Sequence, residues 1–390
     1  MARRSRVIVA GYFARFPIGG YVWQALHYLL GFERLGCEVL FYEDSAYDPL
    51  AYDPRSGASG EDYAFGVRCL GEVLGEFGFG GRWTFWDARR NEFHGRSREA
   101  TRRGLAEADL LVNLAGVNRL GEWRLPPARI YLDIDPAFTQ IRLENQDAGL
   151  RGLLAEHNLF FTFGENVGTS RSPLPTGGLE WRPSRPPVVG DLWDDGPSPP
   201  PDAAFTTIGR WDAVERDLEF RGVRYHWRKS MEWRKFLDLP KRTGERFELA
   251  MDVERAPRDR QALAACGWGL RPPLAVSADP FVYRRYIQAS KGEFSAAKDM
   301  NVRLRSGWFS DRSACYLAAG RPVVVQDTGF GDVVPTGRGL FAVRGLEDAV
   351  EAFAAIGADY AGHAAAARAI ARGEFEASRV LRPLLEAAGC

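Results

Sequence analysis

Two aspartates stand two positions apart in the sequence LDIDP, where an apolar segment ends. A carboxylate at a strand end can take the proton of an attacking hydroxyl group, and a carboxylate pair can also hold a divalent metal ion. Two alternating residues of a strand point to opposite faces, which disfavours a metal ion shared by the pair. The five histidines and five cysteines also show no metal-ligand spacing. We therefore predict no metal site and take Asp133 and Asp135 as candidate catalytic residues, either as the base or as a contact to an acceptor.

A glycine pair near the N-terminus is the second feature that could bind a ligand. Gly19 and Gly20 lie between an apolar run at residues 6–12 and a helical pattern at residues 20–35. Backbone N–H groups at a helix start bind phosphate, and glycine allows close approach. Gly11 precedes Gly19 by eight residues, which differs from the GxGxxG spacing of dinucleotide sites. The pair is a candidate diphosphate or acceptor contact, with a plain connecting loop as the alternative.

Candidate cations for a diphosphate lie in the second half of the chain. Arg210 follows an apolar run in IGRW, and Lys229 lies in the aromatic stretch YHWRKSMEW. The only five lysines all lie between residues 229 and 298, and Lys298 is the last of them. Charged donors bind a diphosphate and stabilise the negative charge of a leaving group. A surface ion pair is the alternative for Arg210, and a solvated helix start is the alternative for Lys229.

The stretch SGWFSDRSACYLAAGRPVVVQDTGF, residues 306–330, combines a helix start with a strand end. Ser310 is a favourable N-cap, Asp311 suits the first turn, and the predicted helix ends at Gly320. A buried strand follows and ends at Asp327. A helix N-terminus suits phosphate groups, and donors at a strand end suit sugar hydroxyls.

The elements that must position these residues form two series of alternating strands and helices. The predicted strands cover residues 6–12, 37–44, 108–117, 128–136 and 158–166 in the first series, and residues 204–211, 246–253, 272–278, 292–298, 321–327 and 339–343 in the second. Such alternation predicts an α/β fold with parallel sheets and ligands at the carboxyl ends of the strands. We predict two Rossmann-like domains facing across a cleft, at residues 1–190 and 204–374, with a proline-rich linker at 182–203. Two helices, near residues 346–356 and 359–385, close the chain.

The composition narrows the range of partners. Basic and acidic residues balance at 51 each, which disfavours a nucleic-acid partner. No apolar run reaches the length of about 18 residues that a membrane-spanning helix requires. The five cysteines are scattered without a CxxC motif, and we expect a cytoplasmic protein.

Two segments resemble the GT-B glycosyltransferases that use nucleotide sugars, and in particular their retaining members. Residues 314–353 carry a helix, an A-x-G-x-P-V-V motif, an acidic–small–glycine strand end and a G-x-L element, as that family does. Residues 19–39 are similar to the family's first helix, which follows a Gly-Gly loop and ends in L-G-x-x-V. IGRW resembles its G-R-L motif. The resemblance covers both domains in their order.

The resemblance implies a nucleotide sugar that lies between the domains, with its nucleotide on the C-terminal one. The candidate contacts are Gly19, Gly20, Arg210, Lys229, Lys298, Ser310, Asp311, Arg312 and Ser313 for the diphosphate and nucleotide, and Asp327, Thr328, Gly329 and Phe330 for the donor sugar. The family also implies that the last helix crosses back, so that residues 375–390 join the N-terminal domain. No cofactor is implied besides the nucleotide sugar as co-substrate.

The chain departs from the family at two glutamates that retaining members commonly carry, where it has Gly307 and Cys315. Asp311 is the candidate replacement for the second, as a contact to the ribose hydroxyls. Retention and inversion of the sugar configuration both stay open. We expect a metal-independent glycosyltransferase that acts on a small-molecule or glycan acceptor. The alternatives are a nucleotide-sugar 2-epimerase on the same fold and a non-catalytic sugar-nucleotide-binding protein.

Overall fold

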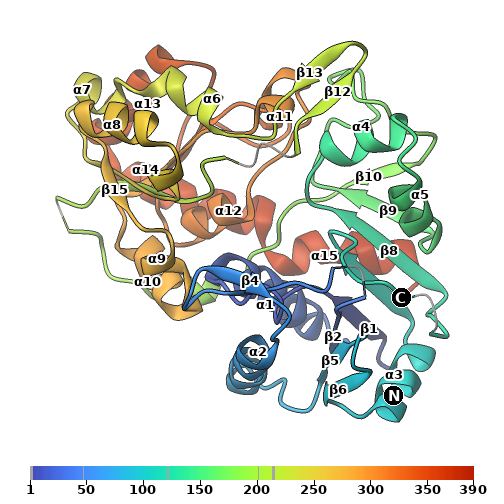
Figure 1. Ribbon diagram of the computed structural model, residues 1–390. Coiled ribbons are helices and arrows are strands. Elements are labelled where there is room, and N and C mark those ends of the chain that lie inside the picture. The colour runs from blue at the N-terminus through green and yellow to red at the C-terminus, as the bar shows by residue number, and fades with distance from the viewer. Residues whose placement is uncertain (1–2, 47, 121–122, 201, 213–215) are drawn as a thin grey trace.

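The computed structural model describes residues 3–46, 48–120, 123–200, 202–212 and 216–390. Two α/β units make up the molecule, one from each half of the chain, and both chain ends lie at the first unit (Figure 1). We call them the N-terminal and the C-terminal domain. Among the residues described, no helix is long and apolar enough to cross a membrane.

The N-terminal domain is built on a sheet with the strand order β10-β9-β8-β7-β1-β2-β5-β6, in which only β6 runs antiparallel to its neighbour. Its strands are β1 (Arg6–Ala10), β2 (Glu38–Asp44), β5 (Trp83–Asp87), β6 (Glu92–Gly95), β7 (Leu110–Leu114), β8 (Ala128–Asp133), β9 (Leu159–Thr162) and β10 (Trp181–Pro183). Its helices are α1 (Gly19–Arg34), α2 (Ala64–Glu76), α3 (Arg98–Glu107), α4 (Phe138–Glu144) and α5 (Ala148–Ala155), and β3 (Ala51–Asp53) pairs with β4 (Ala58–Gly60). All five residues of β7 are buried, as in parallel sheets that are covered on both faces.

The C-terminal domain is built on a parallel sheet with the strand order β15-β14-β11-β16-β17-β18. Its strands are β11 (Phe205–Gly209), β14 (Phe247–Met251), β15 (Gly269–Arg271), β16 (Gly292–Ser295), β17 (Val323–Gln326) and β18 (Leu340–Val343), and a hairpin is formed by β12 (Leu218–Phe220) and β13 (Val223–Tyr225). The helices of this half are α6 (Ser230–Trp233), α7 (Leu239–Thr243), α8 (Pro257–Ala265), α9 (Leu274–Ser277), α10 (Pro280–Ala289), α11 (Asp299–Arg303), α12 (Asp311–Ala318), α13 (Leu346–Ala358) and α14 (Tyr360–Ile370).

One predicted strand is wrong. Residues 272–278 were expected as a strand, but the strand β15 ends before them and residues Leu274–Ser277 form the helix α9. Pro273 occupies the N-cap position of α9, where its missing N–H group costs no hydrogen bond. An apolar run of only a few residues fits a buried helix as well as a buried strand, so the pattern alone could not separate them.

The chain returns to the N-terminal domain through its last helix. The helix predicted over residues 359–385 is interrupted, because a π-helical turn at Ala371–Phe375 separates α14 from α15 (Ala377–Ala388). α15 packs closely on α1, since a Cβ atom on Gly31 would lie 2.5 Å from Leu381 Cδ1. The predicted crossing of this helix to the first domain is confirmed (Figure 1). The residue boundaries of the domains and of the linker stay predictions.

The two domains touch on two sides of the space between their sheets. On one side the hairpin β12–β13 meets α4, where Asn145 Nδ2 donates a hydrogen bond to the carbonyl of Glu219 at 2.7 Å (Figure 1). On the other side α1 meets α10, and Trp23 Nε1 donates to the carbonyl of Pro280 at 2.7 Å. The carboxyl ends of both sheets therefore face a space bounded by contacts between the domains.

Candidate functional site between the domains

A cavity of about 580 Å³ lies between the domains. The residues after β1 and β8 line it from the N-terminal domain, and those after β11, β13 and β16 line it from the C-terminal domain. Six predicted site residues line this cavity, namely Asp133, Asp135, Arg210, Lys229, Lys298 and Asp311. Cavities of this size hold small-molecule ligands, and the carboxyl ends of parallel strands are their usual place.

Lys298 and Asp135 form an ion pair between the domains. Lys298 Nζ lies 2.5 Å from Asp135 Oδ1, and the ammonium group also lies 3.2 Å from the centre of the Trp227 ring. Burial lowers the pKa of Lys298, while Asp135 opposes that shift. The lysine predicted as a phosphate contact and the aspartate predicted as a base therefore neutralise each other in this structure.

Lys229 is a half-buried cation that faces the cavity without a carboxylate partner. In the described chain it makes no ion pair, and the ring of Trp308 is centred 5.9 Å from its Nζ. Burial, together with the positive charges of Arg312 and Lys298, lowers its pKa to about 7. Lys229 thus carries its proton only partly at neutral pH, and an anion placed beside it would favour the charged form.

Two exposed arginines complete the cationic side of the cavity. Arg210 follows β11, and Arg216 precedes the hairpin with its guanidinium group 4.9 Å from the centre of the Trp227 ring. Neither side chain forms a salt bridge within the described ranges. The base of the hairpin is fixed by the buried Asp217, whose carboxylate accepts the backbone N–H of Trp227 at 2.9 Å and a side-chain hydrogen bond from Arg228 at 2.7 Å.

Both basic and acidic side chains line the cavity. Seven basic and five acidic side chains line it, namely Arg15, Arg142, Arg210, Arg216, Arg228, Lys229 and Lys298 on one hand and Asp48, Asp133, Asp135, Asp212 and Asp311 on the other. Three of these arginines are paired with carboxylates that do not line the cavity, since Arg15 pairs with Glu43, Arg142 with Asp147 and Arg228 with Asp217.

Asp133 is buried and surrounded by hydrogen-bond donors. Thr139 Oγ1 donates to its Oδ1 at 2.7 Å, and Gln140 Nε2 and Thr162 Oγ1 donate to its Oδ2 at 2.9 and 2.8 Å. Burial raises its pKa and these hydrogen bonds oppose the shift. The carboxylate holds the connection from β8 to α4 in place. Its predicted part in catalysis stays a prediction.

Asp311 is the first residue of α12 and faces both the cavity and α1. Gln24 Nε2 donates to its Oδ2 at 3.2 Å, and the backbone N–H of Arg312 donates to its Oδ1 at 2.8 Å. Burial raises the pKa of this carboxyl. Ser310 occupies the N-cap position as predicted, but its side chain makes no capping hydrogen bond.

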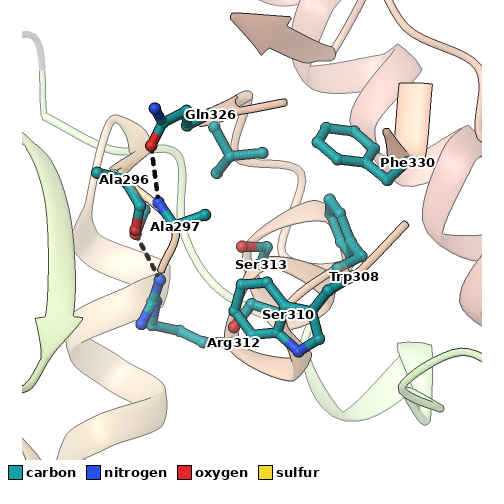
Figure 2. A pocket seen from close by; sticks show the side chains of 11 residues that line it. Ala296, Ala297, Trp308, Ser310, Arg312, Ser313, Gln326 and Phe330 are labelled. Carbon is teal, nitrogen blue, oxygen red and sulfur yellow. Dashed lines mark hydrogen bonds between the residues drawn. The ribbon is translucent and has the colours of Figure 1, made fainter. Parts of the chain in front are cut away.

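A second, much smaller pocket lies behind the start of α12 (Figure 2). It is lined by four predicted contacts, namely Ser310, Arg312, Ser313 and Phe330. Arg312 turns away from the large cavity, because its Nε lies 2.6 Å from Glu293 Oε1 and its Nη2 donates to Ser295 Oγ at 2.9 Å. This arginine therefore ties α12 to β16.

The remaining predicted contacts line neither the cavity nor the small pocket. A Cβ atom on Gly19 would lie 2.4 Å from Tyr283 Cβ, so this glycine permits contact between α1 and α10. The turn of Asp327, Thr328 and Gly329 contacts the other domain through Asn166 Nδ2, which donates to the carbonyl of Gly329 at 3.1 Å. The predicted donor contacts of these residues and of Gly20 stay predictions.

No protein-family model and no curated protein matches the sequence, but solved structures match the fold. An alpha-glucosyltransferase in complex with UDP-glucose and DNA containing an abasic site is similar over 99% of both chains, with a TM-score of 0.62 and 10% identity. HepE from Anabaena, in complex with UDP and glucose, is similar over 99% of this chain and 100% of its own, with a TM-score of 0.56 and 12% identity. AviGT4, a glycosyltransferase involved in avilamycin A biosynthesis, covers 97% of its own chain, with a TM-score of 0.53. The chain has the GT-B fold.

Several residues of this GT-B cavity were missed from the sequence. Many of them are aromatic, including Tyr12, Phe16, Tyr21 and Phe138 on the N-terminal side and Trp308 on the C-terminal side. The available signal was the density of rings beside the glycine pair in YFARFPIGGY. Trp227 of the aromatic stretch YHWRKSMEW also lines the cavity, whereas Trp233 of the same stretch is buried in the core.

The loop between β1 and α1 is held by a buried carboxylate. Glu43 Oε2 accepts the backbone N–H groups of Phe13 and Ala14, both at 2.7 Å, and its Oε1 accepts that of Arg15 at 2.9 Å.

Among the described residues, no group of three or more His, Cys, Asp or Glu side chains is arranged to hold a metal ion. The predicted independence of a metal stays a prediction.

Proposed function

We propose that the protein is a glycosyltransferase whose donor, a UDP-sugar, binds in the cavity between the domains. The observation that carries this proposal is the set of cations without ion-pair partners in the described chain, Arg210, Arg216 and Lys229, on the C-terminal side of the cavity. Solved structures with the same fold hold UDP or UDP-glucose. The positive charges of these unpaired side chains complement the two phosphates of such a donor.

The cations have a direct part in the proposed reaction. The bond from C1 of the sugar to the diphosphate oxygen breaks, and its electron pair leaves with the diphosphate. The acceptor hydroxyl forms a bond to C1 and passes its proton to the departing diphosphate or to a carboxylate, for which Asp133 and Asp135 are the candidates. Negative charge develops on the leaving diphosphate, where Lys229, Lys298 and Arg210 stabilise it. These groups supply the positive charge that a metal ion would otherwise provide, so we propose a metal-independent reaction.

We propose an acceptor other than nucleic acid. The alpha-glucosyltransferase with this fold was solved with DNA, but the present chain has a net charge of zero, without the overall positive charge that favours binding to a phosphate backbone. A small molecule or a glycan is the acceptor class that we retain.

Incubation with a panel of UDP-sugars and a mixture of acceptors tests the proposal through UDP release and the mass of the product. We expect UDP release that depends on the acceptor and persists in EDTA. Arg210→Ala is expected to lower kcat/KM by about 10- to 100-fold, because hydrogen bonds between charged groups contribute roughly 1.5–3 kcal/mol. Arg260→Ala, which removes an exposed arginine outside the cavity, is the control.

Two outcomes would contradict the proposal. Conversion of the donor sugar in the absence of any acceptor indicates an epimerase. Binding of UDP without turnover of any UDP-sugar by any acceptor indicates a non-catalytic binding protein.

A further inference from the structure

Three aromatic side chains form a cluster on the N-terminal side of the cavity. The ring centres of Tyr12 and Tyr21 are 4.6 Å apart, and those of Phe16 and Tyr21 are 5.8 Å apart. All three rings line the cavity, on the loop before α1 and the start of α1. We call Tyr12, Phe16 and Tyr21 the aromatic cluster. The proposed donor contacts come from the opposite domain, so the cluster is free to bind a second molecule.

The aromatic cluster is held in place by contacts with neighbouring residues of the N-terminal domain. Phe16 stacks on Tyr52, with ring centres 6.4 Å apart and planes inclined by 15°. The loop that carries Tyr12 and Phe16 is anchored through the buried carboxylate of Glu43. A set of fixed rings loses little conformational freedom when a ligand stacks on it, which favours binding.

The two arginines described on the N-terminal side of the cavity are both paired with carboxylates. Arg15 Nε lies 3.3 Å from Glu43 Oε1, and Arg142 Nη2 lies 2.7 Å from Asp147 Oδ2. Asp48 adds a negative charge that has no ion-pair partner among the described residues. The unpaired cations lie on the C-terminal side, where the proposed diphosphate needs them. Burial and the negative charges of Asp135 and Asp311 raise the pKa of Tyr12 and Tyr21, and Arg216 and Arg210 oppose that shift at Tyr21 more weakly. An anionic second ligand would therefore meet predominantly negative charge at the aromatic cluster.

We propose that the aromatic cluster is the acceptor subsite and that the acceptor is an uncharged, hydroxyl-bearing ring that stacks on it with an apolar face. This inference rests on the proposed function and specifies its acceptor. The required chemistry is shared by two sources, a neutral sugar ring and a phenolic ring. Both present a flat apolar face to an aromatic side chain and a hydroxyl group at the ring edge.

Initial-rate measurements with matched acceptors test the subsite. Each neutral acceptor is paired with an anionic relative: methyl glucoside with methyl glucuronoside, and phenol with 4-hydroxybenzoate. We expect transfer to a neutral member and at least about tenfold less to its anionic relative. The two pairs separate the sugar from the phenolic source. Faster transfer to an anionic member would overturn the proposal.

Variants of Phe16 test the position of the subsite. Phe16→Ala is expected to raise the acceptor KM by about tenfold, with the Kd of UDP unchanged, because the proposed subsite places this ring against the acceptor and not against the donor. Phe16→Leu keeps most of the side-chain volume, so it separates the loss of stacking from a folding defect, and it is expected to raise the same KM. Phe65→Ala, outside the cavity on α2, is the control.

The outcomes distinguish this inference from the proposed function. UDP binding and transfer in the wild type, with an acceptor KM that neither Phe16 variant changes, would overturn the acceptor subsite alone. Absence of both UDP binding and transfer in the wild type would overturn the proposed function and the subsite together.

Discussion

The ammonium group of Lys298 lies 2.5 Å from a carboxylate oxygen of Asp135, and the two residues belong to different domains. Lys298 follows β16 and Asp135 follows β8, so the ion pair joins the carboxyl ends of the two sheets across the cavity. A diphosphate that enters the cavity must compete with Asp135 for this lysine. The pair thus links donor binding to the contact between the domains.

Asp135→Asn is expected to tighten UDP binding, because it removes the anion that competes for Lys298. The gain is up to about fivefold, since a partly exposed ion pair contributes up to about 1 kcal/mol. Lys298→Met is expected to weaken UDP binding about tenfold or more, because it removes a charged donor. Titration calorimetry measures both, with Lys241→Met as the control on an exposed lysine outside the cavity. Weaker UDP binding by Asp135→Asn would contradict this competition.

UDP binding is expected to take up protons through Lys229. With a pKa of about 7, the Lys229 side chain is neutral in most molecules of the free protein at pH 8. A bound diphosphate raises that pKa, so Lys229 takes up a proton when UDP binds. UDP affinity therefore falls as the pH rises above about 7. Calorimetry at pH 8 in two buffers of different ionisation enthalpy should show uptake of about one proton per UDP. Uptake that persists in Lys229→Met would assign the proton to another group.

Gly19 and Gly20 are expected to differ sharply in their tolerance of a side chain. Gly19→Ala places Cβ 2.4 Å from Tyr283 Cβ, and such overpacking costs roughly 1–3 kcal/mol of stability. Gly20→Ala meets only the Tyr283 hydroxyl at 3.8 Å, and a gain in helix propensity of up to about 1 kcal/mol opposes any loss. Urea unfolding of both variants checks this difference. Equal stability of the two would show that α1 and α10 are not in close contact.

Glu43→Gln is expected to lower the free energy of unfolding by about 3 kcal/mol, because it leaves Arg15 buried without its ionic partner. It also weakens the anchor of the loop that carries the aromatic cluster, since Glu43 accepts three backbone N–H groups. Glu72→Gln, at an exposed position of α2, is the control and is expected to change stability by less than about 0.5 kcal/mol. Chemical unfolding followed by circular dichroism measures both. A loss equal to that of the control would contradict the role of Glu43.

The sequence was sufficient where local pattern and strand order determine position. Asp135 and Arg210 each follow an apolar run, and the carboxyl ends of parallel strands gather at one edge of a sheet. The two sheets face each other, as predicted, and both residues therefore line one cavity. The strand predicted at residues 272–278 was wrong because a short apolar run suits a buried helix and a buried strand equally.

Contacts between distant segments could not be predicted from the sequence. Arg312 stands at a helix start, as a phosphate contact would, but Glu293 and the carbonyl of Ile208 engage it. Gly19 looked like a ligand contact, yet Tyr283 of the other domain accounts for its small size. The position of the aromatic cluster in the cavity could not be predicted either, because aromatic residues near a helix start usually belong to the core. Only the fold shows that they line a cavity.

A crystal structure of the protein with UDP is the sharpest test of the proposed donor site. We expect UDP in the cavity between the domains, with its phosphate oxygens within hydrogen-bond distance of Lys229, Lys298 and Arg210. UDP bound outside this cavity, or its absence from the cavity at saturating concentration, would show that the proposed donor site is wrong.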